Sequence, residues 1–261
     1  MFVDSHCHLE MESFAKDRDQ VIKKSIDEGL KYILTVGTEE RYFETVAEII
    51  NSHPIVYGAI GIHPHNSVDF NRNAAETIRK YLKQKKIVGY GEIGLDFFKN
   101  YSPKERQIKA FREQLALAAD EGLPVIIHSR NALAETMQIL GEAYRNMRGG
   151  VIHCYSYNRE TAKRLLDMGF YISIPGTITY RSAEELARVV EYIPGERILA
   201  ETDAPFLTPH PHRGKRNVPY FVKLTVGKMA EIRHQQAEEL AATICENFVR
   251  LFLNGREVQT E

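Results

Sequence analysis

The chain opens with Met1-Phe2-Val3-Asp4-Ser5-His6-Cys7-His8-Leu9, a short apolar run that passes directly into a polar segment with two histidines. Alternate side chains of a β-strand point to the same face, so Asp4, His6 and His8 are expected to share one. Two imidazoles two residues apart at a strand end form a simple arrangement for binding a metal ion. Such a pair is common in proteins without metal, so the other strand ends decide its meaning.

Short runs of β-branched and apolar residues recur along the chain, at intervals of roughly 20 to 35 residues, and each is followed by a longer helical segment. We expect strands at Phe2 to His6, Tyr32 to Val36, Ile55 to Ile60, Ile87 to Gly91, Pro124 to His128, Val151 to His153, Phe170 to Ile174 and Arg197 to Thr202. This alternation predicts a (β/α)8 TIM barrel forming a single domain, with two further helices at about 220 to 252. An open doubly wound sheet is the alternative, but no GxGxxG turn follows the first strand.

Charge and cysteine usage narrow the class of protein. The chain has 34 Lys and Arg against 35 Asp and Glu, so any polyanion must be bound by a local patch. Its three cysteines, Cys7, Cys154 and Cys245, are odd in number and widely spaced, which does not indicate a disulfide framework. Without a signal-like leader or a long apolar run, we expect a cytoplasmic protein that makes no contact with a membrane.

In a TIM barrel the functional side chains lie where strands end and loops begin. Polar and ionisable residues gather at these ends, namely His6, His8, His63, His65, Glu92, Asp96, His128, Arg130, His153, Glu201 and Asp203. The first and last strands are neighbours in a closed barrel, so His6, His8 and Asp203 could hold one metal ion. The adjacent fifth and sixth strands could hold a second ion through His128 and His153.

Glu92, at the end of the fourth strand, has two carboxylate oxygens and could bridge both ions. Imidazole and carboxylate ligands suit Mg²⁺, Mn²⁺ or Zn²⁺, and the sequence does not choose among them. We therefore predict two divalent metal ions in one cavity.

The motifs at the strand ends resemble, in the same order, those of the TatD family of metal-dependent deoxyribonucleases. They are Asp4-Ser5-His6-Cys7-His8-Leu9, Gly61-Ile62-His63-Pro64-His65, Gly91-Glu92-Ile93-Gly94-Leu95-Asp96, His128-Ser129-Arg130, His153-Cys154-Tyr155-Ser156 and Glu201-Thr202-Asp203-Ala204-Pro205-Phe206. The resemblance implies a hydrolase with His6, His8, Glu92 and Asp203 on one ion and Glu92, His128 and His153 on the other. It also implies that DNA is the substrate, most simply for an exonuclease, which composition and spacing do not show.

Three of these residues are candidates for the chemistry of phosphodiester hydrolysis by metal-activated water. Asp203 could take a proton from the attacking water. Glu201, two residues earlier on the same face, could orient Asp203 or the leaving group. His63 could contact the phosphate or protonate the departing oxygen.

The loop after the last strand, His210-Pro211-His212-Arg213-Gly214-Lys215-Arg216-Asn217, is the expected binding surface for DNA. Arg213, Lys215 and Arg216 place three cations in four residues, which suits salt-sensitive contact with a phosphate backbone. A solvated charge run is the alternative interpretation. His65 and Arg130 are further candidates, and Tyr155, Tyr180 and Phe206 could stack on bases of single-stranded DNA or of frayed ends.

A different hydrolase on the same barrel is the main rival, either an aminoacyl-tRNA deacylase or a small-molecule amidohydrolase acting on ester or amide bonds. Many binuclear amidohydrolases bridge their metals through a modified lysine of the fourth strand. Glu92 stands at that place here, which favours the TatD-like function. A barrel that only binds nucleic acid would not need six converging ligands. The sequence leaves the oligomeric state open.

Overall fold

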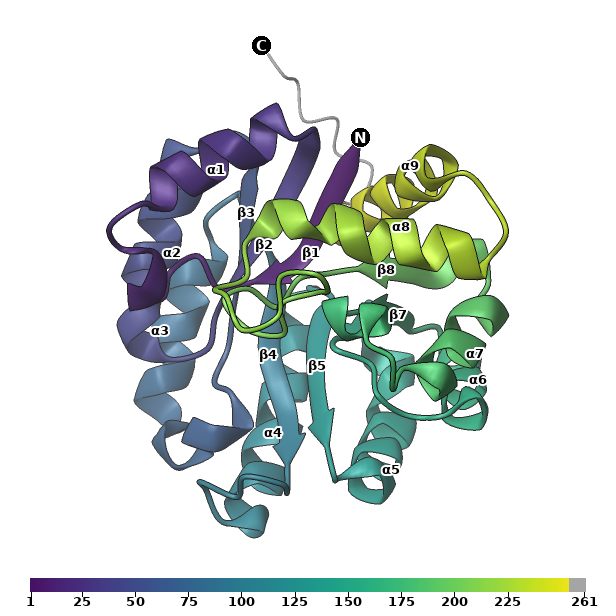
Figure 1. The fold of residues 1–261 in the computed structure, drawn as a ribbon. Helices are drawn as coiled ribbons and strands as arrows, with labels where there is room; N and C mark the ends of the chain where they lie inside the picture. The colour runs from purple at the N-terminus through teal and green to yellow at the C-terminus, as the bar shows by residue number, and fades with distance from the viewer. Residues whose placement is uncertain (254–261) are drawn as a thin grey trace.

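The computed structural model describes residues 1–253, in which eight parallel strands neighbour one another in sequential order (Figure 1). The strands are β1 (Phe2–Cys7), β2 (Leu30–Gly37), β3 (Val56–Ile60), β4 (Ile87–Asp96), β5 (Val125–Arg130), β6 (Gly150–Ile152), β7 (Tyr171–Ile174) and β8 (Ile198–Ala200). The α-helices are α1 (Arg18–Asp27), α2 (Glu40–Ser52), α3 (Arg72–Leu82), α4 (Lys104–Asp120), α5 (Leu133–Ala143), α6 (Arg159–Asp167), α7 (Glu184–Tyr192), α8 (Val222–Ile232) and α9 (Ala237–Phe248). The predicted (β/α)8 barrel is confirmed.

The barrel closes between its first strand and the segment that follows its last. Cys7 and Ala204 form an isolated parallel bridge, and the Asp203 N–H donates to the His6 carbonyl over 2.9 Å. Closure therefore runs through the residues that the sequence marks as functional, and it brings β1 and Asp203 side by side.

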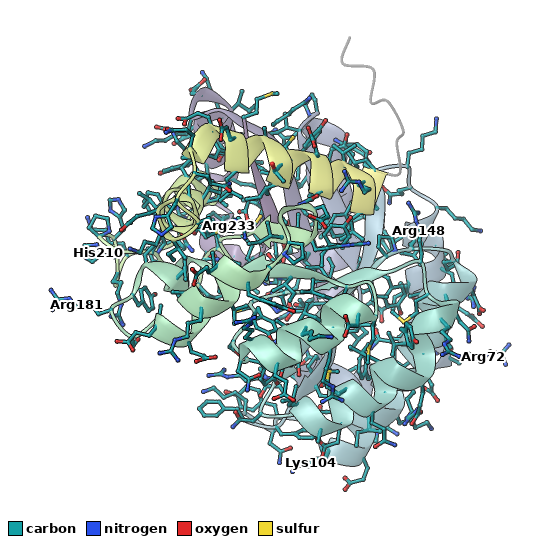
Figure 2. The ribbon with its side chains drawn as sticks, turned by 90° about the vertical axis from the view of Figure 1, so that its right-hand side faces the viewer. Arg72, Lys104, Arg148, Arg181, His210 and Arg233 are labelled. Atoms are coloured by element: carbon teal, nitrogen blue, oxygen red, sulfur yellow. The ribbon has the colours of Figure 1, made fainter. Side chains whose placement is uncertain are left out.

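The helices cover the outside of the strands and supply large apolar side chains to the core. Phe43 of α2, Phe111 of α4 and Phe248 of α9 are all completely buried. Helices α8 and α9 lie over the seam where β1 meets β8 (Figure 1), and they correspond to the two C-terminal helices expected at about 220 to 252. Charged side chains such as Arg72 and Lys104 point outward from the helices (Figure 2). None of the helices in residues 1–253 is long and apolar enough to cross a membrane.

Several strands end one or more residues from the predicted position, and two of these differences, in β4 and β8, concern the candidate ligands. Strand β4 continues past Gly91 as far as Asp96, so Glu92 lies within the strand and not after it. Strand β8 ends at Ala200, because the chain beyond it leaves β7 and turns toward β1. Both differences affect how ligands are presented to the cavity.

Candidate metal centre

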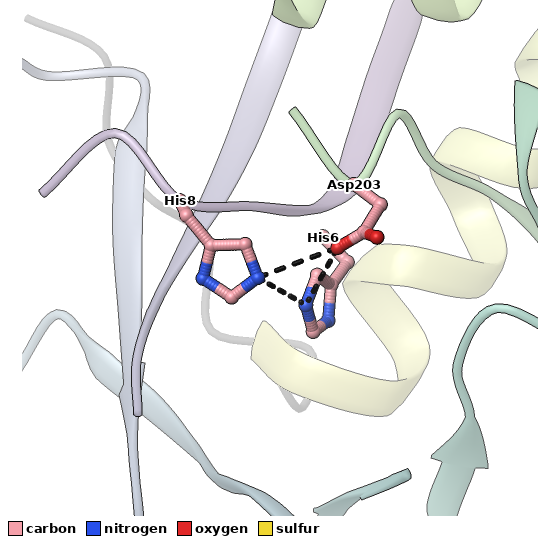
Figure 3. Close-up of side chains that lie close together, drawn as sticks. All are labelled: His6, His8 and Asp203. Carbon is pink, nitrogen blue, oxygen red and sulfur yellow. Dashed lines mark hydrogen bonds and ion pairs between the residues drawn. The ribbon is translucent and has the colours of Figure 1, made fainter. Parts of the chain in front are cut away.

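The first group of candidate ligands joins β1, β4 and the segment after β8. The Nε2 atoms of His6 and His8 lie 3.2 Å apart, and each faces the Oδ1 atom of Asp203, at 3.7 and 3.3 Å (Figure 3). Glu92 turns its Oε2 atom toward the same imidazoles, 3.4 Å from His6 and 3.9 Å from His8. Two nitrogens and two carboxylate oxygens thus converge on one point.

The second group uses the other oxygen of Glu92. Its Oε1 atom lies 2.7 Å from His128 Nδ1 and 2.8 Å from His153 Nε2, and these two nitrogens are 3.3 Å apart. His6 and His153 stack with ring centroids 4.1 Å apart, so the two groups are in direct contact. The structure therefore brings all six predicted ligands into one cluster, with Glu92 between the two sets of histidines.

An irregularity in the pairing of β4 with β5 explains how Glu92 reaches this position. Gly91 pairs with Ile126 and Ile93 with Ile127, which leaves Glu92 as an extra residue in the ladder. Such a bulge redirects a side chain without ending the strand. Gly94, with φ of 141°, then lies so close to β5 that a Cβ atom would come within 1.9 Å of the His128 carbonyl oxygen.

The outer nitrogens of His8 and His128 face hydrogen-bond acceptors, whereas that of His153 lies near a carboxylate oxygen without a hydrogen bond. His8 Nδ1 lies 2.9 Å from the Val36 carbonyl and 3.1 Å from the buried carboxylate of Glu10. His128 Nε2 lies 3.1 Å from Asp96 Oδ2, and His153 Nδ1 lies 3.3 Å from Glu201 Oε1. A ring nitrogen next to an acceptor keeps its proton, so the lone pair of the neutral ring falls on the inner nitrogen.

His63 has the opposite arrangement. Its Nδ1 atom accepts a hydrogen bond from the His65 N–H over 3.1 Å, and burial lowers the pKa of His63 to about 4. The neutral ring must therefore carry its proton on Nε2, which points toward Glu92 Oε1 at 3.4 Å. His63 is thus prepared to donate a hydrogen bond in the cavity and not to ligate a metal ion through Nε2.

The charges in the cluster also fit divalent cations. Burial raises the pKa of Glu92, but the charge of His153 and the hydrogen bonds from His128 and His153 outweigh it and hold the pKa well below its usual range. Burial likewise raises the pKa of Asp203, and its contact with His8 reverses this and lowers it. Ionised carboxylates and imidazole lone pairs, within 4.8 Å of one another in each of three groups, are ligands that such ions prefer.

Two buried acidic side chains, Glu201 and Asp4, lie next to the ligands. Glu201 is completely buried and accepts from the Cys154 N–H over 2.7 Å; its contact in the cluster is with His153, not with Asp203 as we expected from their spacing. Asp4 binds the Thr202 N–H over 2.8 Å and so ties β1 to the segment after β8. The catalytic role predicted for Glu201 stays a prediction.

Three residues near the site were not predicted from the sequence. Glu10 contacts His8 and accepts a hydrogen bond from the Thr35 hydroxyl over 2.7 Å. Gln107 and Gln114, two buried glutamines of α4, bind backbone groups near the site. For Glu10, the signal in the sequence is an acidic residue two positions after His8. For Gln107 and Gln114, the signal is a polar residue on the apolar face of a predicted helix.

The loop residues predicted to bind DNA differ in their exposure and in their partners. Arg213 is exposed and stacks over Tyr180, 4.2 Å from its ring centroid, and Lys215 is exposed beside it. Arg216 instead forms a two-contact ion pair with Asp17, at 2.6 and 2.9 Å. His210, from the same loop, projects away from the molecule (Figure 2).

Two further predicted contacts are His65, in the segment after β3, and Arg130, the last residue of β5. His65 Nε2 is 3.0 Å from Asp96 Oδ2, and Arg130 covers the ring of Phe98 at 4.0 Å. Tyr155 was suggested as a residue that stacks on bases, but it is only 1% exposed, so the prediction for Tyr155 is wrong.

The chain is similar to known proteins over most of its length. The family model described as "TatD related DNase" matches residues 3–253. An uncharacterized metal-dependent hydrolase of Bacillus subtilis, YabD, is 38% identical over 252 residues, which cover 97% of this chain and 99% of that protein. A protein of Erwinia tasmaniensis named 3'-5' ssDNA/RNA exonuclease TatD is 36% identical and covers 95% of this chain and 98% of its own. The crystal structure of YJJV, a TatD homolog from Escherichia coli, superposes with a TM-score of 0.91 at 31% identity, over 97% of this chain and 98% of that one. The chain therefore belongs to the TatD family of metal-dependent hydrolases.

Proposed function

We propose that this protein is a two-metal nuclease that removes nucleotides from the end of single-stranded DNA or RNA. The observation that carries the two-metal assignment is the position of Glu92, whose Oε2 faces His6 and His8 while its Oε1 faces His128 and His153. The nucleic-acid substrate is supported by the relatives named 3'-5' ssDNA/RNA exonuclease TatD, among them the Erwinia protein.

The chain's own residues would hold the ions in two sets that share one carboxylate. His6, His8, Asp203 and one oxygen of Glu92 would bind the first, and His128, His153 and the other oxygen of Glu92 the second. When bound, two divalent ions lower the pKa of a water molecule and neutralise charge on the phosphoryl oxygens. Glu10 and Asp96 would fix the rings of His8 and His128 by holding the proton on each outer nitrogen.

Asp203 is the carboxylate best placed to take a proton from water. Its side chain is 14% exposed, whereas that of Glu92 is 4% exposed and is contacted by histidines on both oxygens. His63 would donate its Nε2 proton in a hydrogen bond to the phosphate or to the departing oxygen, since its Nδ1 is occupied by the His65 N–H. A positioned proton donor or acceptor contributes about 10²- to 10⁴-fold in rate.

The experiment is degradation of an end-labelled single-stranded oligonucleotide by protein loaded with Mg²⁺, Mn²⁺ or Zn²⁺, with metal content measured on the same samples. We expect a ladder that EDTA removes, whose direction follows from labelling each end in turn. His63→Ala should lower turnover by about 10²-fold or more. His53→Ala, which removes a histidine that pairs with Asp19 away from the cluster, should not change it.

If metal-loaded protein cleaves neither DNA nor RNA, the nuclease proposal is wrong, and esters or amides become the candidate substrates. If active protein contains one metal ion per chain, the two-metal assignment is wrong, but the nuclease proposal is not contradicted.

A further inference from the structure

A pair of exposed aromatic rings stands at the edge of the candidate metal centre and is not used by the mechanism above. Phe98 is 54% exposed and Tyr101 is 69% exposed, and both follow β4 in the loop that leads to α4. Large apolar side chains so exposed are a small group in residues 1–253, and rings of this kind commonly mark a binding site.

Hydrogen bonds hold the loop that carries these rings. Asp96 Oδ1 accepts hydrogen bonds from the N–H groups of Phe98 and Lys99, over 3.0 and 2.9 Å. The Ser102 hydroxyl donates to the His65 carbonyl over 2.7 Å, which ties the far end of the loop to the segment after β3. The rings therefore sit on a loop that is anchored at both ends, and they lose little freedom when they bind a ligand.

The rings are also continuous with the metal centre. The Tyr101 ring lies 4.8 Å from that of His65, which lies 6.4 Å from that of His128, a candidate ligand. Asp96 connects the same residues, since its Oδ2 atom contacts His65 and His128 while its Oδ1 atom holds the loop. A base stacked on the Tyr101 ring would thus lie beside His65, which neighbours the candidate ligand His128.

The charge around the rings favours a polyanion. The guanidinium of Arg130 lies over the Phe98 ring, 4.0 Å from its centroid, and pairs with no carboxylate in the described part of the chain. Lys99 lies 5.8 Å from the same ring, and Lys104 lies over Phe97 at 4.6 Å. Aromatic faces next to unpaired cations are how proteins bind single-stranded nucleic acids, by stacking on bases and pairing with phosphates.

We infer that Phe98 and Tyr101, with Arg130, form a stacking subsite for an unpaired base next to the scissile phosphate. The inference rests on the proposed nuclease function and makes it more specific. Because a base inside a duplex is already stacked on its neighbours, the subsite would also select single-stranded ends.

The test is binding of metal-loaded protein to a fluorescent, phosphorothioate-linked oligothymidylate, which resists cleavage, compared with the same backbone lacking its bases. Wild-type protein should bind the base-bearing strand about tenfold more tightly. The variant Phe98→Ala/Tyr101→Ala should lose most of this preference, while Phe98→Tyr should keep it. Ile26→Ala is the matched control, because Ile26 is 46% exposed but lies at the end of α1 that leads into β2, on the opposite side of the barrel.

A double variant that keeps the wild-type preference for bases would overturn the inference. So would a double variant with an altered oligomeric state and an unaltered base preference, since the rings would then serve association between copies of the chain. Cleavage of the phosphodiester-linked strand is measured on the same samples and tests the nuclease function separately. Base-dependent binding without cleavage of this strand or of the matching RNA would contradict the nuclease function but not the base-binding subsite.

Discussion

Gln107 and Gln114 lie two turns apart on the buried face of α4, and each binds both backbone groups of a residue at a different strand end. Gln114 accepts from the Ile62 N–H over 2.8 Å and donates to the Ile62 carbonyl over 2.9 Å. Gln107 does the same for Asp96, over 2.8 and 3.1 Å. Helix α4 thus fixes the backbone of Asp96 and of Ile62, the residue before His63.

Replacing Gln114 with Leu should weaken both folding and catalysis. The change leaves the N–H and C=O of Ile62 buried without partners, which costs about 1–3 kcal/mol of unfolding free energy. Because Ile62 precedes His63, turnover should fall further than stability explains at a temperature where the variant is folded. Urea unfolding and oligonucleotide cleavage measure the two effects. Gln138→Leu, on the exposed face of α5, should change neither; an equally small effect at Gln114 would contradict this role for α4.

Gly94→Ala should damage the second metal set. Its Cβ atom would meet the His128 carbonyl oxygen at 1.9 Å, and φ of 141° is unfavourable for alanine, so β5 must move away from β4. We expect a loss of at least about 2 kcal/mol in stability and a metal content lowered by the ion that His128 would help to bind.

The matched control for this change is Gly227→Ala. Gly227 lies within α8 with open space around it, and alanine there should stabilise the helix by about 0.5–1 kcal/mol. Equal metal content in wild type and Gly94→Ala would show that His128 tolerates the displacement.

Much of the fold and of the ligand set could be predicted because both depend on local patterns. Apolar runs of strand length and helix signals recur often enough to define the barrel, and strand ends in a barrel converge whatever their separation in sequence. His6, His8, His128 and His153 were therefore recognisable as candidates before their distances were known.

The contacts that distinguish one histidine from another were not predictable in this way. Whether a ring nitrogen carries its proton depends on a neighbour from another strand or from the backbone, as with the Val36 carbonyl at His8 and the His65 N–H at His63. The bulge at Glu92 was also missed, because Gly91 and Gly94 weaken the strand pattern, although a glycine within a strand often marks such a bulge. The pairing of Arg216 with Asp17 joins residues 199 positions apart and has no local signal.

That ion pair leads to different salt effects for the two arginines of the loop. Arg213 faces solvent, so its charge can neutralise a phosphate, whereas the charge of Arg216 is already matched by Asp17. If this loop binds nucleic acid, Arg213→Ala should reduce the slope of log affinity against log salt concentration by about one, and Arg216→Ala should change it less. Fluorescence anisotropy over a salt series measures both slopes. Equal slopes for the two variants would indicate that Arg216 leaves Asp17 to bind the strand.

Metal binding should release protons, and the pKa shifts of the histidines give the direction. Burial lowers the pKa values of His8 and His153, but Asp203 and Glu10 around the first, and Glu92 and Glu201 around the second, outweigh it and raise both well above the ordinary value. Without metal these rings are charged near neutral pH, and the proton on the inner nitrogen must leave before an ion can bind.

The sign for stability follows from the same shifts. A histidine whose pKa is raised by folding stabilises the metal-free protein fully below its unfolded pKa of about 6.5, and this stabilisation is lost as the pH rises through the folded value. Bound metal ions replace these protons. The increase in unfolding temperature on adding metal should therefore grow from pH 6 to pH 8, by roughly the amount expected when one or two protons are released. Calorimetric titration with metal in two buffers of different ionisation enthalpy counts the protons released. Binding without proton release, or a thermal gain that shrinks as the pH rises, would mean that these histidines are not the ligands.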